Sequence, residues 1–375
     1  LFYLDDRAWI TSVNSGYQIN DQFKVVLNFL YKDVNRQGHD DFAPYHTAPF
    51  TEPQYLKTSF TGLSFNSNLL DQKLKTEVFG KYYGYNALVT EEYYAIDSDE
   101  RVREVISQQG EFGGGVATSF NTDRKFLLKF SVERAIRLPT TREALGDGVN
   151  VLNSPNLGPE NSINVNLGAS LGKYFFGTYN SIRVNVNTFY RDTRDLIWPV
   201  LAGGRGEIRF ENFTNNLSKG VEFEAQYDYD SKVELSYNLT YLDQRNNAEF
   251  EEGVRNIVYG DRLKNAPFLM SNAGLNVKWD HLIQQNSSSF LYCQAGYIHE
   301  YFLAWPSLGD PESKSTIPSQ FSLDVGYSYT FPKRTLSLAV DVSNVLNAQL
   351  YDNFLLQKPG RAFALKVSYR ITNNN

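Results

Sequence analysis

Arginines and aromatic residues occur together in three long polar segments of this 375-residue sequence, and a fourth segment carries aromatic residues. A guanidinium group can form paired hydrogen bonds to a carboxylate or another anionic group. Aromatic rings can stack on the flat groups of a ligand. These segments therefore predict ligand binding, although surface loops of any protein contain the same residue types. The candidate binding residues are Tyr93, Tyr94, Arg101 and Arg103; Trp198, Arg205 and Arg209; Arg255, Tyr259 and Arg262; and Trp305.

Residues suited to catalysis or metal binding are sparse in comparison. The sequence has four histidines, and His39 and His46 lie beside acidic residues with a spacing that could hold a metal ion. A solvated polar loop is the simpler interpretation of that segment, so we predict no metal site. No Ser–His–Asp arrangement has a spacing that requires catalysis, and we expect neither an enzyme nor a cofactor. The single cysteine, Cys293, excludes an internal disulfide.

The composition limits the class of protein. The formal net charge of -6 at pH 7 disfavours a nucleic-acid partner. The 25 Tyr and 26 Phe suit β-strands and the aromatic girdles of membrane barrels. No apolar run approaches the roughly 18 residues of a membrane-spanning helix. Strands are therefore the elements that we expect to position the candidate binding residues.

The clearest pattern lies between Ser319 and Ile371. Apolar residues occupy every second position in three successive segments, near 319–330, 334–346 and 361–371. Strand side chains point alternately to the two faces of a sheet, so each segment predicts one apolar and one polar face. These segments reach about the 9–11 residues that cross a bilayer, whereas a strand of a soluble protein usually has about 5–6. The pattern therefore favours membrane-spanning strands over a soluble all-β array.

About fifteen such strands are expected along the chain. Tight turns alternate with long polar connections, which is typical of outer-membrane barrels with short periplasmic turns and long extracellular loops. We therefore predict an all-β fold, a transmembrane antiparallel β-barrel whose polar side chains face a wet lumen or a plug. The expected strands are 8–18, 23–32, 58–68, 73–84, 111–120, 125–137, 161–172, 181–197, 217–229, 232–244, 267–279, 289–302, 319–330, 334–346 and 361–371. The long connections are 33–57, 85–110, 138–160, 198–216, 245–266, 303–318 and 347–360.

Several motifs resemble those of TonB-dependent outer-membrane receptors. Near the C-terminus, Val342–Asn347 is similar to the corner that ends that family's penultimate strand, and Pro359–Phe363 is similar to the opening of its last strand. Upstream, Asn153–Glu160 resembles the family's Asn-Pro-x-Leu-x-Pro-Glu loop. Phe189–Asp192 and Lys219–Glu222 resemble the two strands that follow that loop. The motifs occur in the family's order, and this agreement makes the resemblance specific.

The resemblance implies that residues 1–375 are the C-terminal part of a single receptor barrel domain of about 22 strands. An N-terminal plug and the first strands would lie outside this sequence. One departure is Ile371, which stands where the family usually has a terminal Phe. The implied function is active uptake of a scarce ligand, such as a ferric siderophore, haem or cobalamin, across the outer membrane of a Gram-negative bacterium. The implied partners of this monomeric barrel are outer-membrane lipid, the small-molecule or metal-chelate ligand, and TonB acting through the N-terminal region.

Two other functions fit the strand pattern, namely a passive outer-membrane porin and a surface barrel without transport. A porin has no need of the receptor motifs. The sequence upstream would distinguish it, because a receptor carries a plug domain there. Energy-dependent uptake of a ligand by cells would separate a receptor from a barrel that does not transport.

Overall fold

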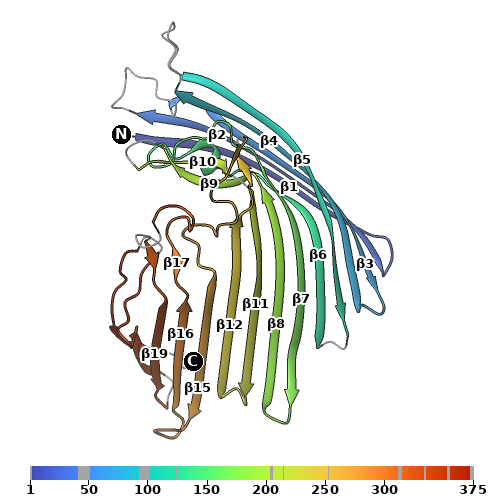
Figure 1. Ribbon diagram of the computed structural model, residues 1–375. Helices are drawn as coiled ribbons and strands as arrows, with labels where there is room; N and C mark the ends of the chain where they lie inside the picture. The colour runs from blue at the N-terminus through green and yellow to red at the C-terminus, as the bar shows by residue number, and fades with distance from the viewer. Residues whose placement is uncertain are drawn as a thin grey trace. The chain divides into compact units, whose positions relative to one another are not determined.

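The computed structural model of the protein contains one sheet of fifteen strands. The structure describes residues 2–40, 51–92, 102–122, 125–202, 206–213, 215–251, 253–310, 315–332, 335–352 and 355–371. The strands follow one another through the sheet in chain order, as Figure 1 shows. The ladders from β1 to β5 and from β12 to β21 are antiparallel. This arrangement confirms the prediction of about fifteen antiparallel strands. The sheet contains β1 (Phe2–Gln18), β2 (Phe23–Asp40), β3 (Gln54–Leu69), β4 (Leu74–Glu92), β5 (Val102–Asn121), β6 (Phe126–Arg137), β7 (Glu160–Phe176), β8 (Asn180–Arg194), β11 (Asn216–Tyr229), β12 (Val233–Asn246), β15 (Leu269–Asp280), β16 (Ser288–Ile298), β19 (Gln320–Thr330), β20 (Leu336–Ser343) and β21 (Ala362–Tyr369).

The contacts within the chain define two compact units. Unit 1 comprises Leu1–Phe120, Phe130–Val165 and Arg191–Asn216. Unit 2 comprises Asn121–Lys129, Asn166–Tyr190 and Leu217–Asn375. Each unit has its own part of the sheet and its own long connections.

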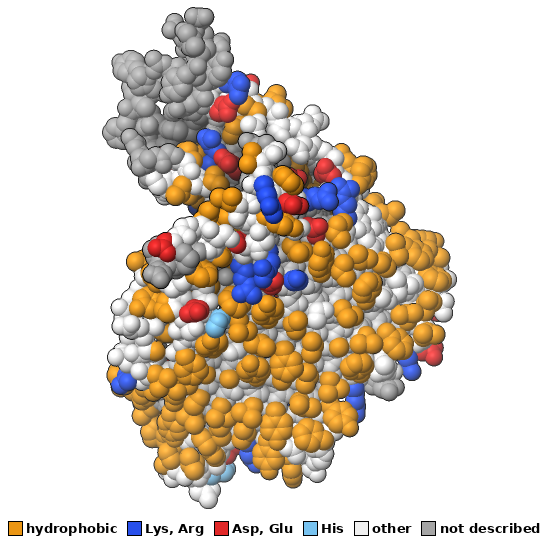
Figure 2. All heavy atoms as spheres, in the orientation of Figure 1, with side chains coloured by type: hydrophobic (Ala, Val, Ile, Leu, Met, Phe, Trp, Pro, Cys, Tyr) orange, Lys and Arg blue, Asp and Glu red, His pale blue; other side chains and the backbone are white. Residues whose placement is uncertain are grey.

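In unit 2 the sequence alternation produces one continuous apolar face. Its side chains remain exposed, since Leu235 and Phe363 are 46% and 73% accessible to solvent. Figure 2 shows apolar side chains gathered over this face of β12 and β15. The adjacent rows on the opposite face are polar, for example Ser236, Gly274, Gln294 and Asp324. One row of the apolar face, read from pair to pair across the strands, consists of Leu235, Leu275, Cys293, Val325, Val342 and Phe363.

Unit 1 has the same two faces. A row of its apolar face contains Tyr17, Val25, Phe65, Val78 and Val116. Tyr17, Phe65 and Val78 are exposed. The neighbouring row on the polar face contains Gln18, Lys24, Asn66 and Glu77. Because strand side chains alternate between faces, a register shift of one residue would exchange these two rows. The observed register therefore keeps the apolar and polar sets of side chains apart.

The long connections contain more structure than the sequence pattern indicates. They include the helix α1 (Thr141–Leu145) and three short hairpins: β9 (Leu196–Leu201) with β10 (Ile208–Phe213), β13 (Phe250–Glu251) with β14 (Val254–Arg255), and β17 (Tyr301–Phe302) with β18 (Thr316–Ile317). The expected strand 181–197 is divided between β8 and β9, because Asp195 adopts a φ of 55° that turns the chain. No helix in the described ranges has the length and apolarity that crossing a membrane would require.

Strands β1 to β5 also extend further toward the long connections than predicted. Asp6, for example, pairs with Arg36, and Gln54 pairs with Arg36 from the other side. These residues are polar or charged, so they interrupt the apolar alternation by which the strand ends were predicted. Backbone pairing does not need apolar side chains, and the ladder continues through them.

The buried core of unit 1 lies on the polar face of the sheet, under α1. Ala144 and Leu145 of α1 are 0% and 3% exposed. The hydroxyl of Thr140 accepts a hydrogen bond from the Glu143 amide at 3.3 Å, and the Glu143 carboxylate accepts one from the Thr140 amide at 2.8 Å. This reciprocal pair satisfies backbone donors at the start of the helix. The polar face is therefore not uniformly polar: the buried strand residues beneath α1 are Leu56, Tyr85, Ala87 and Val89.

The two faces of the C-terminal strands can be tested with spin labels on the full-length protein in a lipid bilayer. Labels at Leu338 and Leu365 should be accessible to oxygen, which partitions into lipid, because these side chains lie on the apolar face. Labels at Ser337 and Lys366 should be accessible to a water-soluble nickel chelate instead. Power-saturation measurements would compare the two accessibilities at each position. The opposite assignment would mean that the register of β20 and β21 is wrong.

Candidate functional site

In unit 1 the segment 138–160 and the β9–β10 hairpin bond to each other, and together we call them the loop module. The Leu152 amide donates to the Ile208 carbonyl oxygen at 2.8 Å, and the Ile208 amide donates to the Asn150 carbonyl oxygen at 2.9 Å. The Asn212 side chain accepts from the Gly158 amide at 2.7 Å and donates to the Gly158 carbonyl oxygen at 3.0 Å. Within the motif Asn153–Glu160, Gly158 thus binds the hairpin through both of its backbone groups.

Glu160, the last residue of this motif, joins the hairpin to β6. Its Oε1 atom accepts hydrogen bonds from the Ile197 amide at 2.8 Å and from Nη2 of Arg137 at 2.6 Å. Leu157 is 2% exposed. The motif therefore has a structural role in this chain, because it fastens the hairpin to the strands of the sheet.

Arg36 attaches the loop module to the first strands. Its Nε and Nη2 atoms each donate to a carboxylate oxygen of Asp6 at 2.6 Å, and Nη1 donates to the Gly146 carbonyl oxygen at 2.6 Å. The side chain is only 9% exposed. The Asn153 side-chain amide also donates to the carbonyl oxygen of Thr90 on β4. A paired, hydrogen-bonded charge of this kind is costly to disrupt, because losing one partner leaves a buried charge.

Asp147 shapes the turn after α1. Its Oδ1 atom accepts hydrogen bonds from the amides of Val149, Asn150 and Val151 at 3.0, 2.9 and 2.8 Å. Burial by itself raises the pKa of this carboxyl, but the three amides and the nearby Arg142 outweigh that effect and hold its pKa below the ordinary value. Asp147 therefore stays ionised and keeps the turn closed at neutral pH.

The structure places two of the predicted binding residues in the loop module. Trp198 pairs with Glu211, and Arg209 pairs with Val200, so all four side chains share one face of the β9–β10 hairpin. The Nε atom of Arg209 is buried and has no hydrogen-bond partner among the described atoms. Buried polar atoms are normally paired, so this nitrogen is an exception among the described polar atoms of the hairpin.

The other predicted residues of unit 1 are placed as follows. Arg103 lies on β5 and forms an ion pair with Glu91 of β4. Tyr93, Tyr94, Arg101 and Arg205 lie outside the described residues.

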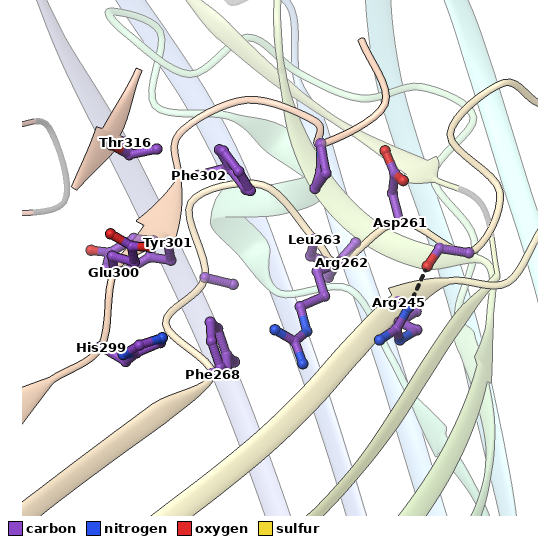
Figure 3. A pocket seen from close by; sticks show the side chains of 13 residues that line it. Arg245, Asp261, Arg262, Leu263, Phe268, His299, Glu300, Tyr301, Phe302 and Thr316 are labelled. Atoms are coloured by element: carbon purple, nitrogen blue, oxygen red, sulfur yellow. Dashed lines mark hydrogen bonds between the residues drawn. The ribbon is translucent and has the colours of Figure 1, made fainter. Parts of the chain in front are cut away.

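In unit 2 the long connections form a cavity of about 460 Å³ at the ends of β12, β15 and β16, which we call the basic pocket (Figure 3). Figure 3 shows the Arg262 guanidinium beside Phe268, with His299 on the other side of that ring. The principal side chains that line the basic pocket are those of Arg245, Arg262, Phe268, His299, Glu300 and Tyr301.

Asp243 fixes both arginines of the basic pocket. Its two carboxylate oxygens accept hydrogen bonds from the Nε atoms of Arg245 and Arg262, each at 2.8 Å. Asp243 itself is 4% exposed. The guanidinium carbon of Arg262 lies 3.9 Å from the centre of the Phe268 ring, within the range of a cation–π contact. The carboxylates of Asp261 and Glu300 also line the cavity, so the two guanidinium groups are balanced by acidic side chains.

Arg262 is the predicted residue that lines the basic pocket. Trp305 is not among the lining residues but directly precedes Pro306, which is, and the Lys264 ammonium lies 6.0 Å from the centre of the tryptophan ring. Arg255 and Tyr259 belong to the same long connection but are exposed outside the pocket.

Sequence reasoning missed Arg245, Phe268 and His299. A signal for Arg245 was present, because Tyr241, Asp243 and Arg245 continue the period of two beyond the apolar part of β12. Phe268 and His299 carried no such signal, since the sequence does not reveal that two separate connections meet around Arg262.

The faint metal-site pattern at His39 and His46 gains no support from the described residues. His39 stacks on Tyr3 with 4.6 Å between ring centres, and His46 lies outside the described residues. Among the residues that the structure describes, no group of three or more His, Cys, Asp or Glu side chains could hold a metal ion.

Comparisons with known proteins identify related sequences and folds. A family model described as TonB dependent receptor-like, beta-barrel, matches residues 101–345. Similar solved structures include the copper transporter OprC (14% identity, TM-score 0.70), the FrpB iron transporter from Neisseria meningitidis (13%, 0.69) and BauA, the ferric preacinetobactin receptor from Acinetobacter baumannii (14%, 0.62). Each similarity covers 98% of this chain, but only 57%, 56% and 54% of the respective structures. The chain therefore spans just over half their length. No curated protein matches the sequence significantly.

Truncation of Leu145 should loosen the loop module. Leu145→Ala removes a side chain that is 3% exposed, and such a change costs about 2–5 kcal/mol in a packed core. We expect faster hydrogen exchange at the amides of Leu152 and Ile208, measured on the full-length protein. Leu201→Ala is the control, because Leu201 is 80% exposed on the same module. Equal exchange rates in the two variants would show that α1 does not hold the module.

Proposed function

The chain belongs to the TonB-dependent receptor-like β-barrel family, and we propose that it is the C-terminal part of a receptor for active uptake across the outer membrane of a Gram-negative bacterium. The family match over residues 101–345 is the observation that carries this proposal. The receptor would take energy from TonB through an N-terminal plug domain that lies outside the residues that the structure describes. The share of the similar structures that the chain spans supports a longer protein of this kind.

The two faces of the sheet support membrane embedding. The exposed apolar rows of each unit would contact lipid, and the polar rows would face the lumen. A strand needs about 9–11 residues to cross a bilayer, and β12 and β15 have 14 and 12. The additional residues would carry the long connections beyond the membrane, where they could meet a ligand.

The ligand proposed for this receptor is a metal ion or a metal chelate. The similar structures are named as a copper transporter, an iron transporter and a receptor for ferric preacinetobactin. The loop module lies on the polar face, and Arg209 presents a buried guanidinium nitrogen without a partner among the described atoms. Arginine suits the carboxylate or other anionic groups that such chelates carry. The loop module is therefore the proposed place of ligand capture in this part of the receptor.

Uptake by energised cells tests the proposed function. Cells that express the full-length gene should accumulate at least one member of a radiolabelled panel of ferric siderophores, haem, cobalamin and copper. Accumulation should stop when the proton-motive force is dissipated or TonB is deleted. Uptake that persists under both conditions would indicate a passive porin. A barrel that reaches the outer membrane but accumulates none of the panel would indicate a surface protein without transport.

Substitution of Arg209 tests the role of the loop module. Arg209→Gln should raise the ligand concentration for half-maximal uptake by about tenfold or more, because a hydrogen bond from a charged group contributes about 1.5–3 kcal/mol. The maximal rate should change little if Arg209 acts in capture only. Arg134→Gln is the matched control, since Arg134 is exposed and paired with Glu111. An identical response of the two variants would remove Arg209 from the ligand site.

A further inference from the structure

Despite its two arginines, the basic pocket carries more acidic than basic side chains. The carboxylates of Asp261 and Glu300 line the cavity together with the guanidinium groups of Arg245 and Arg262. Asp243 adds a third carboxylate, because it bonds to both arginines and is only 4% exposed. Three carboxylates against two guanidinium groups disfavour an anion in the cavity and favour an occupant with one positive charge.

All but one of these charged groups already have partners within the protein. Asp243 and the two arginines bind one another. The two oxygens of Asp261 accept hydrogen bonds from the amide and the hydroxyl of Ser307. The carboxylate of Glu300, in contrast, has neither a hydrogen bond nor an ion pair with any residue that the structure describes. Glu300 therefore provides the free acceptor of the cavity.

Tyr301 supplies a second unpaired group beside Glu300. It lines the cavity and is 9% exposed, and its hydroxyl has no hydrogen-bond partner among the described residues. Burial, and to a smaller extent the negative charge of Asp352, raises the pKa of this hydroxyl, so the hydroxyl stays protonated. In the view of Figure 3, Glu300 and Tyr301 lie at one side of the cavity and Arg245 lies at the other. The free acceptor is thus separated from the paired arginines.

Apolar side chains form much of the remaining wall. Leu263, Phe268, Phe302 and Pro306 line the cavity from the connections that precede β15 and follow β16. The Asn265 amide donates to the Phe302 carbonyl oxygen at 2.8 Å and thereby holds these two connections together. Phe302 itself is 40% exposed. Because aromatic faces stack on flat rings and attract cations, this wall suits a flat apolar body that carries a positive charge.

From these observations we propose that the basic pocket binds an organic cation, an amine with a flat apolar body. The ammonium group would donate to the Glu300 carboxylate and the Tyr301 hydroxyl oxygen, and the apolar body would lie against Phe302. The cavity of about 460 Å³ is within the size range of small-molecule sites. The site would reject the anionic chelates proposed above for the loop module, so it is a second site for a different class of ligand. Binding there requires no transport.

A matched series of indoles tests the charge of the occupant. Tryptamine, tryptophol and indoleacetate share one ring but end in an ammonium group, a hydroxyl and a carboxylate. Fluorine NMR would follow the binding of their ring-fluorinated forms to the full-length protein in dodecyl maltoside, an uncharged detergent, with protein-free micelles as the blank. We expect tryptamine to bind about tenfold or more tightly than tryptophol, because it alone forms a charged hydrogen bond, and indoleacetate to bind most weakly. Equal affinities or the reverse order would overturn the proposal.

Substitutions of Glu300 locate the charge recognition to the pocket. Glu300→Gln should weaken tryptamine binding by about tenfold and leave tryptophol binding unchanged, since only the ammonium group needs the carboxylate. Glu300→Lys should reverse the preference, so that indoleacetate binds more tightly than tryptamine. Glu249→Gln is the matched control, because Glu249 is exposed on a long connection of the same unit and does not line the cavity. Tryptamine affinity that is identical in the wild type and in Glu300→Gln would remove Glu300 from the site.

Phe302→Ala tests the contact with the apolar body, and Phe302→Leu replaces it if the alanine variant does not fold. Removal of the ring should weaken the binding of all three indoles to a similar degree and keep their order, because they share the ring that Phe302 would contact. Unchanged affinities in a folded variant would contradict this placement. Displacement of tryptamine by phosphatidylethanolamine added to the micelles would assign the pocket to a lipid amine and overturn the flat-ring ligand.

Ligand uptake by cells separates this site from the proposed function. Cells that express Glu300→Gln should accumulate the chelate as the wild type does, since the chelate would be captured at the loop module. Wild-type cells that accumulate no ligand of the panel would overturn the proposed function, while selective binding of tryptamine by the purified protein would still support the pocket assignment.

Discussion

The antiparallel backbone ladder is the interaction on which the other features of this protein depend. The strands of the sheet pair their amide and carbonyl groups with those of their neighbours, from β1 at one edge to β21 at the other. Within the described residues β1 pairs with β2 alone, and β21 pairs with β20 alone. An unsatisfied backbone group costs several kcal/mol in hydrocarbon. In the proposed membrane setting, each strand therefore needs a neighbour on both sides.

Once the ladder is formed, its register decides what each face can do. The period of two places Leu275, Cys293 and Val325 on one face, and Gly274, Gln294 and Asp324 on the other. The free energy of transfer of the apolar row favours lipid, while the polar row requires water or hydrogen-bond partners. The core under α1 departs from this division, because Leu56 and Ala87 are apolar but lie on the polar face. The loop module resolves the conflict by burying them.

The arginines of the chain illustrate how position on this sheet changes the meaning of one residue type. Arg36 is buried on the polar face, and its bonds to Asp6 and Gly146 make it part of the scaffold. Arg209 belongs to the loop module and retains a buried nitrogen without a partner among the described atoms, which fits ligand capture. Arg245 and Arg262 share the buried carboxylate of Asp243, which holds both side chains at the end of β12. Residue type alone does not separate these roles.

The sequence by itself determined the membrane-strand fold and the family. Alternation is a local property of the chain, so segments such as 319–330 and 361–371 could be recognised without any tertiary contact. The motif Asn153–Glu160 likewise indicates the family through residues that are contiguous in the chain. Strand ends were harder to predict, because backbone pairing continues through polar residues such as Asp6 and Arg36. Only the tertiary structure decided how the connections fold. The cluster that buries Leu145 with Ala87, and the contacts of Phe268 with Arg262 and His299, join residues that are distant in sequence, and no local pattern encodes them.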